Sequence, residues 1–320
     1  MVETQPPPLA KKHFLAVLGL GSTALVWGGT FAAVAYALRA GLSVNALLSL
    51  RFVLGALALG TALLAMRMKP TKRELVDSLW LGLVLATLFW FQTDGLRFTS
   101  TAKSAFITGL YVIFTPMISV LVGDRLRASH GFGAGLALAG LLLLVYQPGL
   151  SLGGWNRGDS ETLLNAVLVG VHIVMTGHFS RRGRGWVLAW GQVAVVGVLF
   201  SIAAACSPAP YGFQSIQTSF RTPGLWIALA YLALLGTTVA FYVQSTMQAF
   251  VSATETAVLF SMEPVFAAIV AVSGWVPGIK EHLSPRQWAG AVLIVSATLI
   301  AELGPRLWKT RTIADEEAIG

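Results

Sequence analysis

The stretch GWVLAWGQVAVVGVLFSIAAACSPAPYGFQSIQTSF, from Gly185 to Phe220, contains no Asp, Glu, Lys or Arg. The same is true of Thr222–Thr254 and of Ala128–Asn156. Each of these stretches is longer than the roughly 20 residues that a helix needs to cross about 30 Å of hydrocarbon. The sequence therefore predicts a protein that crosses a membrane several times.

Composition supports the same conclusion. Of 320 residues, 55% are hydrophobic and 11% are charged, whereas a soluble domain carries about 25% charged residues. The single cysteine, Cys206, excludes an internal disulfide and a thiolate metal cluster. The net charge of +8 comes from short basic clusters between apolar spans, so it indicates anchoring at the cytoplasmic membrane surface rather than binding of nucleic acid.

We expect an all-α integral membrane protein with ten transmembrane helices. The apolar stretch after Lys11 and Lys12 is longer than the hydrophobic part of a signal peptide, so it is interpreted as a retained first helix. The spans are expected near residues 14–38, 45–66, 78–97, 100–122, 131–147, 161–180, 186–206, 223–246, 251–275 and 285–303. This leaves two tails, 1–13 and 304–320, and a central connection at 148–160.

The distribution of basic residues predicts the orientation. If the N-terminus is inside, the cytoplasmic segments carry 14 of the 22 Lys and Arg residues and the outer segments carry 7. Short cytoplasmic loops are normally enriched in Lys and Arg. We therefore expect a multi-pass protein of the cell membrane with both termini in the cytoplasm.

The chain also contains an internal repeat. Ser78–Leu83 (SLWLGL) resembles Gly224–Leu229 (GLWIAL), and Phe114–Met117 (FTPM) aligns with Met262–Val265 (MEPV). The repeat divides the chain into two halves, 14–147 and 161–303. Because each half has five expected helices, the second half enters the membrane upside down, which is the inverted repeat typical of secondary transporters.

Several motifs carry a resemblance to a known family. They are WGGTF from Trp27, FQTDGLRFTSTAKSAFITGLYVIFTP from Phe91, GD at Gly123, EP at Glu263, and EHLSPRQWAG from Glu281. In order and spacing they resemble the drug/metabolite transporter superfamily, specifically proteins with two EamA-type domains. The resemblance implies a ten-helix secondary carrier, commonly an exporter of amino acids or related metabolites, and not an enzyme. The halves differ at one position, since Thr115 precedes the first proline and Glu263 the second.

Two prolines and a carboxylate suggest where a substrate passes. Pro116 and Pro264 are expected near the centres of the fourth and ninth helices, where each removes a backbone donor. Paired broken helices mark a transport pathway, although packing kinks would have the same sequence. Glu263 lies at mid-depth, where an ionised carboxylate is costly. It is a candidate for proton coupling or for binding a substrate amine, and the alternative is a neutral cap on the kink.

Further polar and aromatic residues are candidates for the same pathway. Arg51, Asp94 and Arg97 could form an outer gate or hold a substrate carboxylate, and the alternative is snorkelling by Arg51 beside an interfacial Asp94–Arg97 pair. His172 could titrate, or it could be hydrogen-bonded in the core. Aromatic walls with a few amides suit a small amphiphilic metabolite, and the candidates of this kind are Trp27, Phe31, Trp90, Tyr111, Trp190 and Gln244.

Competing classes of function have weaker support. No GxxxxGK[ST] loop is present, so ATP-driven transport by this chain alone is not expected. An intramembrane enzyme would need convergent catalytic side chains, but Arg51, Asp94, His172 and Glu263 are scattered over four expected helices. A scaffold or sensor would use extramembrane surface, of which little remains. We expect a small-molecule substrate, with a proton if Glu263 is the coupling site, and no cofactor or metal.

The first prediction concerns topology. In a background in which Cys206 is replaced by alanine, a membrane-impermeant thiol reagent added outside should modify a cysteine placed at Ser151 and spare one placed at Ser129. The opposite labelling pattern would contradict the inverted-repeat assignment.

Overall fold

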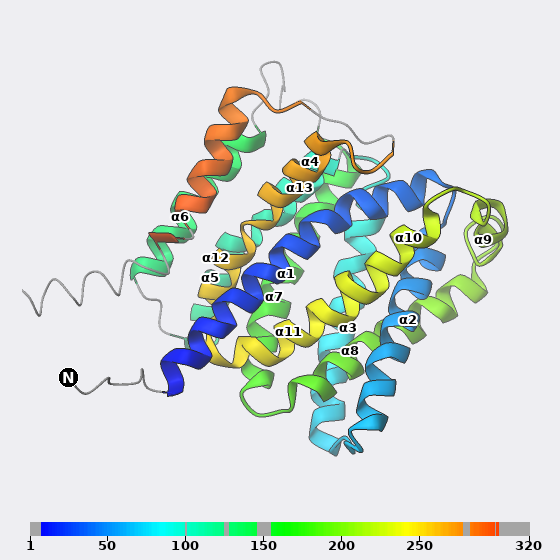
Figure 1. Cartoon of the computed structure of the whole chain (residues 1–320), viewed down its shortest axis with the longest axis horizontal. Coiled ribbons are helices and arrows are strands. Elements are labelled where there is room, and N and C mark those ends of the chain that lie inside the picture. The colour runs from blue at the N-terminus through cyan, green and yellow to red at the C-terminus, as the bar shows by residue number, and fades with distance from the viewer. Residues whose placement is uncertain are drawn as a thin grey trace, which may run out of the picture.

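The computed structural model describes residues 8–99, 101–124, 128–145, 155–277, 282–297 and 299–300. Every regular element in these ranges is a helix (Figure 1). The expected tails, 1–13 and 304–320, and the connection 148–160 lie wholly or mostly outside the described residues.

Eight helical segments in the described ranges are long and apolar enough to cross a membrane. They are Lys11–Arg39, Val44–Ala65, Lys72–Gly95, Ser104–Leu121, Arg157–Ser180, Gly185–Cys206, Leu225–Phe250 and Ala253–Ser273. These segments coincide, within a few residues, with eight of the spans expected from the sequence. Two further helical segments lie at the positions of the expected fifth and tenth spans. They are α6 (Ala128–Val145) and the segment over 285–297.

Some spans are single helices and others are divided. The undivided ones are α1 (Pro8–Arg39), α2 (Val44–Ala65), α3 (Lys72–Gly95), α7 (Arg157–Ser180) and α8 (Gly185–Cys206). A short helix, α9 (Gln214–Ser219), follows α8. The divided spans comprise α4 (Thr101–Gly109) with α5 (Tyr111–Leu121); α10 (Leu225–Ala230), η2 (Tyr231–Val239), α11 (Ala240–Met247) and η3 (Gln248–Phe250); and α12 (Ala253–Phe260) with α13 (Glu263–Ser273).

Local sequence determines where several helices begin. Reciprocal capping boxes start α3 with Thr71 and Glu74, and α12 with Ser252 and Glu255. In each box one side chain accepts a backbone N–H of the first turn and the other accepts the N–H of the cap residue. The bends between spans therefore have a defined hydrogen-bonding pattern.

The interruptions lie close to the two prolines, but not at them. The first falls at Leu110, before α5, and the second at Ser261 and Met262, before α13. Pro264 lies in the first turn of α13, where the missing N–H would have had no helical partner. Pro116 lies inside α5. The sequence thus indicates the interrupted spans, whereas the exact break depends on packing.

The middle of the eighth span is a π-helix, η2, which packs against α1 and α2. The N–H of Ala240 reaches the carbonyl of Leu235, and the hydroxyl of Thr237 donates to the carbonyl of Leu232 at 2.9 Å. The wider turn changes which carbonyls remain available to neighbouring helices, and such segments are frequent at functional sites.

The helices of the two halves pack reciprocally. The first helix of the first half, α1, packs on α12 and α13, and the first helix of the second half, α7, packs on α4 and α5. A Cβ atom added at Gly28 in α1 would lie 2.9 Å from the carbonyl oxygen of Glu263. One added at Gly170 in α7 would lie 3.2 Å from the backbone nitrogen of Thr115. Both glycines therefore allow close approach to the residue that precedes a proline.

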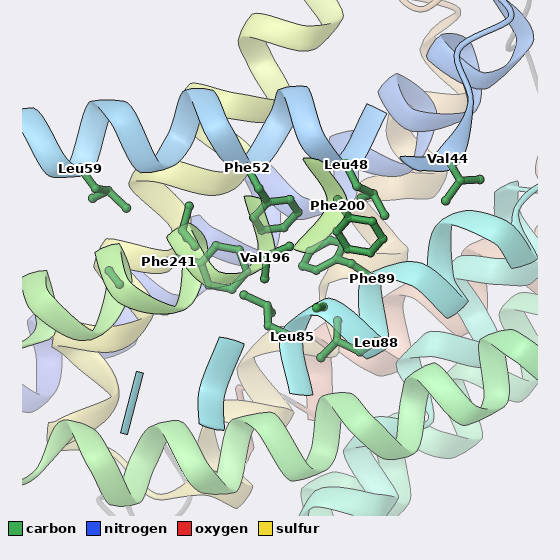
Figure 2. Close-up of a cluster of buried hydrophobic side chains, with 13 residues drawn as sticks. Val44, Leu48, Phe52, Leu59, Leu85, Leu88, Phe89, Val196, Phe200 and Phe241 are labelled. Atoms are coloured by element: carbon green, nitrogen blue, oxygen red, sulfur yellow. The ribbon is translucent and has the colours of Figure 1, made fainter. Parts of the chain in front are cut away.

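A cluster of buried hydrophobic side chains lies between α2, α3, α8 and α11, and we call it the aromatic cluster after its four rings, Phe52, Phe89, Phe200 and Phe241 (Figure 2). The rings of Phe52 and Phe89 lie 4.9 Å apart between centroids, and Phe89 lies 6.2 Å from Phe241. Large buried rings contribute strongly to packing, so this cluster holds α2, α3, α8 and α11 together beside the centre of the bundle.

The helix over 285–297 lies beside α6 (Figure 1). Ala134 and Ala137 of α6 share a buried cluster with Ile294. Small residues on α6 let the two helices approach each other, as is typical of contacts between membrane helices.

Candidate functional site

A cavity lies at the centre of the bundle, between α1, α2, α3, α7, α11 and the interrupted helices. Six of the expected pathway residues line it, namely Trp27, Arg51, Tyr111, His172, Gln244 and Glu263. The space that water can reach is about 50 Å³, whereas pockets for small ligands begin at roughly 300 Å³. The cavity is therefore too small for a metabolite as it stands and must widen to take one.

Glu263 is the acidic residue of this cavity. It is 7% exposed and begins α13, directly after the interruption of the ninth span. The hydroxyl of Tyr111 donates a long hydrogen bond, 3.4 Å, to Oε2 of Glu263. A carboxyl group at the N-terminus of a helix is also stabilised by the helix dipole. The break in the span thus provides a local environment that tolerates a buried carboxyl group.

Arg51 is the basic residue of the same cavity and is only 1% exposed. Its Nε donates to Oγ1 of Thr237 at 2.8 Å, and its Nη2 donates to the carbonyl of Gly236 at 3.1 Å. The guanidinium also lies 4.6 Å from the centre of the Phe89 ring. The side chain therefore points into the bundle towards η2 and does not snorkel to the surface.

Arg51 and Glu263 are not partners in this conformation. Among the ion pairs of the described residues, none joins the two side chains. An acidic and a basic side chain therefore line one cavity without pairing with each other, and each has other protein partners.

The WGGTF motif builds one wall of the cavity. The Nε1 of Trp27 donates to the carbonyl of Gly236 at 3.0 Å, and its ring packs 5.0 Å from Phe260. Thr30 also lines the cavity, whereas Phe31 is buried in a separate cluster with Ala105 and Ala267. The glycines of the motif have a steric role, because Gly28 lies against the backbone of α13.

Two buried polar groups extend from the cavity. His172 is 3% exposed, and its Nε2 lies 2.8 Å from Oε1 of Gln192, whose Nε2 donates to Ser245 at 3.0 Å. The Nε2 of Gln244 donates to Gln248 at 3.3 Å, while the buried Oε1 of Gln244 has no hydrogen-bond partner among the described residues. A buried acceptor without a protein partner is unusual, so a donor from water or a ligand would complete it.

One end of the bundle has a larger vestibule of about 450 Å³ that includes Trp90 and Asp94. Asp94 binds Arg97 at 2.8 Å and Arg157 at 2.7 Å, so Arg51 is not part of this network. The contact between Asp94 and Arg97 can be predicted from the sequence, because the two residues are three apart in the chain. Arg157 was missed because it lies at the far end of the connection between the halves.

The other end has a vestibule of about 650 Å³, which includes His13 and Glu255. Nε2 of His13 lies 2.6 Å from Oε1 of Glu255 and joins the start of α1 to the start of α12. On the same side Asp77 of α3 binds Arg182 at 2.6 Å. Charged contacts thus join helices at both ends of the bundle, while the central cavity lies between them.

The remaining expected residues lie outside the central cavity. Pro116 and Pro264 are buried in α5 and α13, and Trp190 is partly buried against the aromatic cluster. In the described part of the chain, no group of three or more His, Cys, Asp or Glu side chains could hold a metal ion.

Comparisons with known proteins cover nearly the whole chain. Residues 14–146 and 157–302 match the EamA-like transporter family. An uncharacterized transporter of Archaeoglobus fulgidus is 32% identical over 294 residues, which are 91% of this chain and 87% of the relative. The uncharacterized transporter YcxC of Bacillus subtilis is 24% identical over 70% of this chain and 72% of its own length. A crystal structure of a protein with 20% identity shares the fold, with a TM-score of 0.67 and coverage of 92% of this chain and 98% of the other.

The second prediction concerns the contact between α1 and α13. Gly28→Ala should destabilise the protein by about 1–3 kcal/mol, because the added methyl group overpacks the backbone beside Glu263. Gly21→Ala is the matched control in the same helix, since its methyl group meets no atom within 4 Å. Thermal unfolding of the purified variants measures the difference, and equal melting temperatures for the two variants would contradict this packing.

Proposed function

This chain belongs to the EamA-like transporter family, and from that premise we propose that it is a secondary transporter that exports a small metabolite by alternating access. It is a multi-pass membrane transporter and not an enzyme. The observation that carries the proposal is the small central cavity lined by two buried ionisable side chains, Arg51 and Glu263. Such residues inside a membrane bundle mark substrate and ion pathways.

The proposed architecture is ten transmembrane helices in two inverted five-helix repeats, 14–147 and 161–303, joined by an outer connection at 148–160. Reciprocal packing supports it, because α1 contacts α13 at Gly28 in the way that α7 contacts α5 at Gly170. The two matched family regions, 14–146 and 157–302, also suggest a repeat. The proposed orientation in the cell membrane has both tails, 1–13 and 304–320, in the cytoplasm, on the basis of the Lys and Arg distribution.

The proposed substrate is an amino acid or a related amphiphilic metabolite. The aromatic wall formed by Trp27, Phe89, Phe241 and Phe260 suits an apolar side chain, and the polar groups of the cavity suit a charged end. The substrate would pass from one vestibule to the other along the expected residues, with Trp90 and Asp94 in the outer vestibule. The interruptions near Pro116 and Pro264 would let the fourth and ninth helices bend as the cavity changes sides.

We assign proton coupling to Glu263. Glu263 is a buried carboxyl group inside the bundle, and carboxyl groups in such positions serve as proton relays in membrane transporters. Exchange of a proton as the cavity opens to either side would link the pH gradient to substrate movement. His172 is the next titratable candidate, although its bond to Gln192 gives it a structural partner.

The test is transport by purified protein in proteoliposomes, with uptake and efflux of a panel of amino acids and aromatic metabolites measured with and without a pH gradient. Accumulation of at least one compound is expected. No movement of any compound in either direction would contradict the proposed function.

The third prediction applies to the same assay. Glu263→Gln preserves size and hydrogen-bonding capacity but cannot ionise, so it should abolish accumulation driven by a pH gradient and leave gradient-free exchange largely intact. Glu161→Gln, outside the central cavity, is the matched control and should remain driven by the gradient. If transport by Glu263→Gln keeps its pH dependence, Glu263 is only a cap of α13.

A further inference from the structure

We propose that Arg51 is the specificity-determining anchor for a carboxylate group on the transported molecule. The inference rests on the proposed function, since it assigns a role within the central cavity. It goes further because it names the group that the cavity selects and the residue that selects it.

Burial of Arg51 is the first observation. A guanidinium that is 1% exposed in the middle of a membrane bundle normally faces an acidic side chain, because an uncompensated buried charge is strongly unfavourable. Here its hydrogen bonds go to a hydroxyl and a carbonyl, at Thr237 and Gly236. These two groups carry no formal charge, and Glu263, which lines the same cavity, forms no ion pair with Arg51, so a substrate carboxylate would supply a direct ionic partner.

The second observation is that the guanidinium is held in a fixed position. The two bonds to η2 use two of its five N–H donors, and the rings of Phe89 and Phe52 lie 4.6 and 5.3 Å away. A guanidinium fork that is held in this way can bind the two oxygens of a carboxylate with its other donors. The position is therefore organised before the ligand arrives, which reduces the entropy lost on binding.

The π-helix is what makes this position possible. The carbonyl of Gly236 accepts hydrogen bonds from both Trp27 and Arg51. A Cβ atom added at Gly236 would lie 2.8 Å from Cγ2 of Thr30 and 3.5 Å from Nη2 of Arg51. Glycine at this position and the wide turn of η2 thus bring the carbonyl up to the guanidinium.

The rest of the cavity complements a carboxylate at Arg51. Glu263 and Gln244 line the same space, and the carboxyl group of Glu263 suits an ammonium or another N–H donor. The aromatic wall suits the apolar remainder. By contrast, Arg97 and Arg157 are 44% and 61% exposed and already bind Asp94, so neither is expected to select the substrate.

The experiment uses four probes that share one phenyl group and differ in charge. They are L-phenylalanine, its methyl ester, phenethylamine and 3-phenylpropionate. Binding to the purified full-length protein in lipid nanodiscs is measured by quenching of tryptophan fluorescence, and transport is measured by counterflow in proteoliposomes. The two readouts separate loss of recognition from loss of movement.

The wild-type protein should prefer the two carboxylates, phenylalanine and phenylpropionate, over the ester and the amine. Arg51→Met should weaken binding of both carboxylates by about tenfold or more and change binding of phenethylamine by less than about twofold. Arg73→Met is the matched control, because Arg73 is exposed at the start of α3 and lies outside the cavity. It should leave all four affinities unchanged.

Thr237→Val addresses the case in which Arg51→Met fails to fold. It keeps the charge of Arg51 but removes the acceptor of Nε, so it should weaken carboxylate binding selectively and by a smaller factor. Equal binding of phenylalanine and its ester by the wild type, binding of neither carboxylate, or an unchanged preference in the folded variants would overturn the proposal. Transport of phenethylamine alone would overturn the role of Arg51 and leave the proposed function intact, whereas failure of the wider panel would remove both.

Discussion

Two ionisable side chains must be accommodated inside a bundle whose outer surface faces hydrocarbon, and the centre of the structure depends on that constraint. Neither Arg51 nor Glu263 reaches the surface, so the protein itself has to supply their polar partners. Arg51 obtains them from the π-helix η2, and Glu263 obtains them from Tyr111 and the start of α13. Irregular backbone therefore provides the partners of Arg51 and the local environment of Glu263, and the regular helices α2, α3 and α8 lie around it.

The contacts at the two ends of the bundle complement this centre. At one end α3 is joined to the segment before α8 by the pair Asp77–Arg182, and at the other it is joined to the start of α7 by Asp94–Arg157. The exposed arginines in these pairs are screened by solvent, so each pair contributes little to stability on its own. Their effect is to fix which helices meet at the vestibules. The central cavity lies between the two sets of contacts.

Much of the fold follows from the sequence, because charge-free apolar runs have few alternatives in a membrane. Eight of the ten expected spans and the buried position of Glu263 can be inferred in this way, whereas the inverted repeat is a proposal. The partners of Arg51 cannot be inferred from the sequence, because they lie in a π-helix whose sequence is that of an ordinary apolar helix. The pair Asp94–Arg157 cannot be predicted from the sequence either, because the two residues are far apart in the chain. Gly28 illustrates an intermediate case: the motif is visible in the sequence, but its contact with the backbone of Glu263 requires the folded structure.

The central claim is that a single cavity opens alternately to the two vestibules. Double electron–electron resonance tests it most directly, with one pair of spin labels at the exposed Phe98 and Tyr211 and a second pair at the exposed Val122 and Phe250. In transport-active proteoliposomes, conditions that lengthen the distance within one pair should shorten it or leave it short within the other. Distance distributions that lengthen together, or that stay unchanged while substrate is transported, would contradict the account.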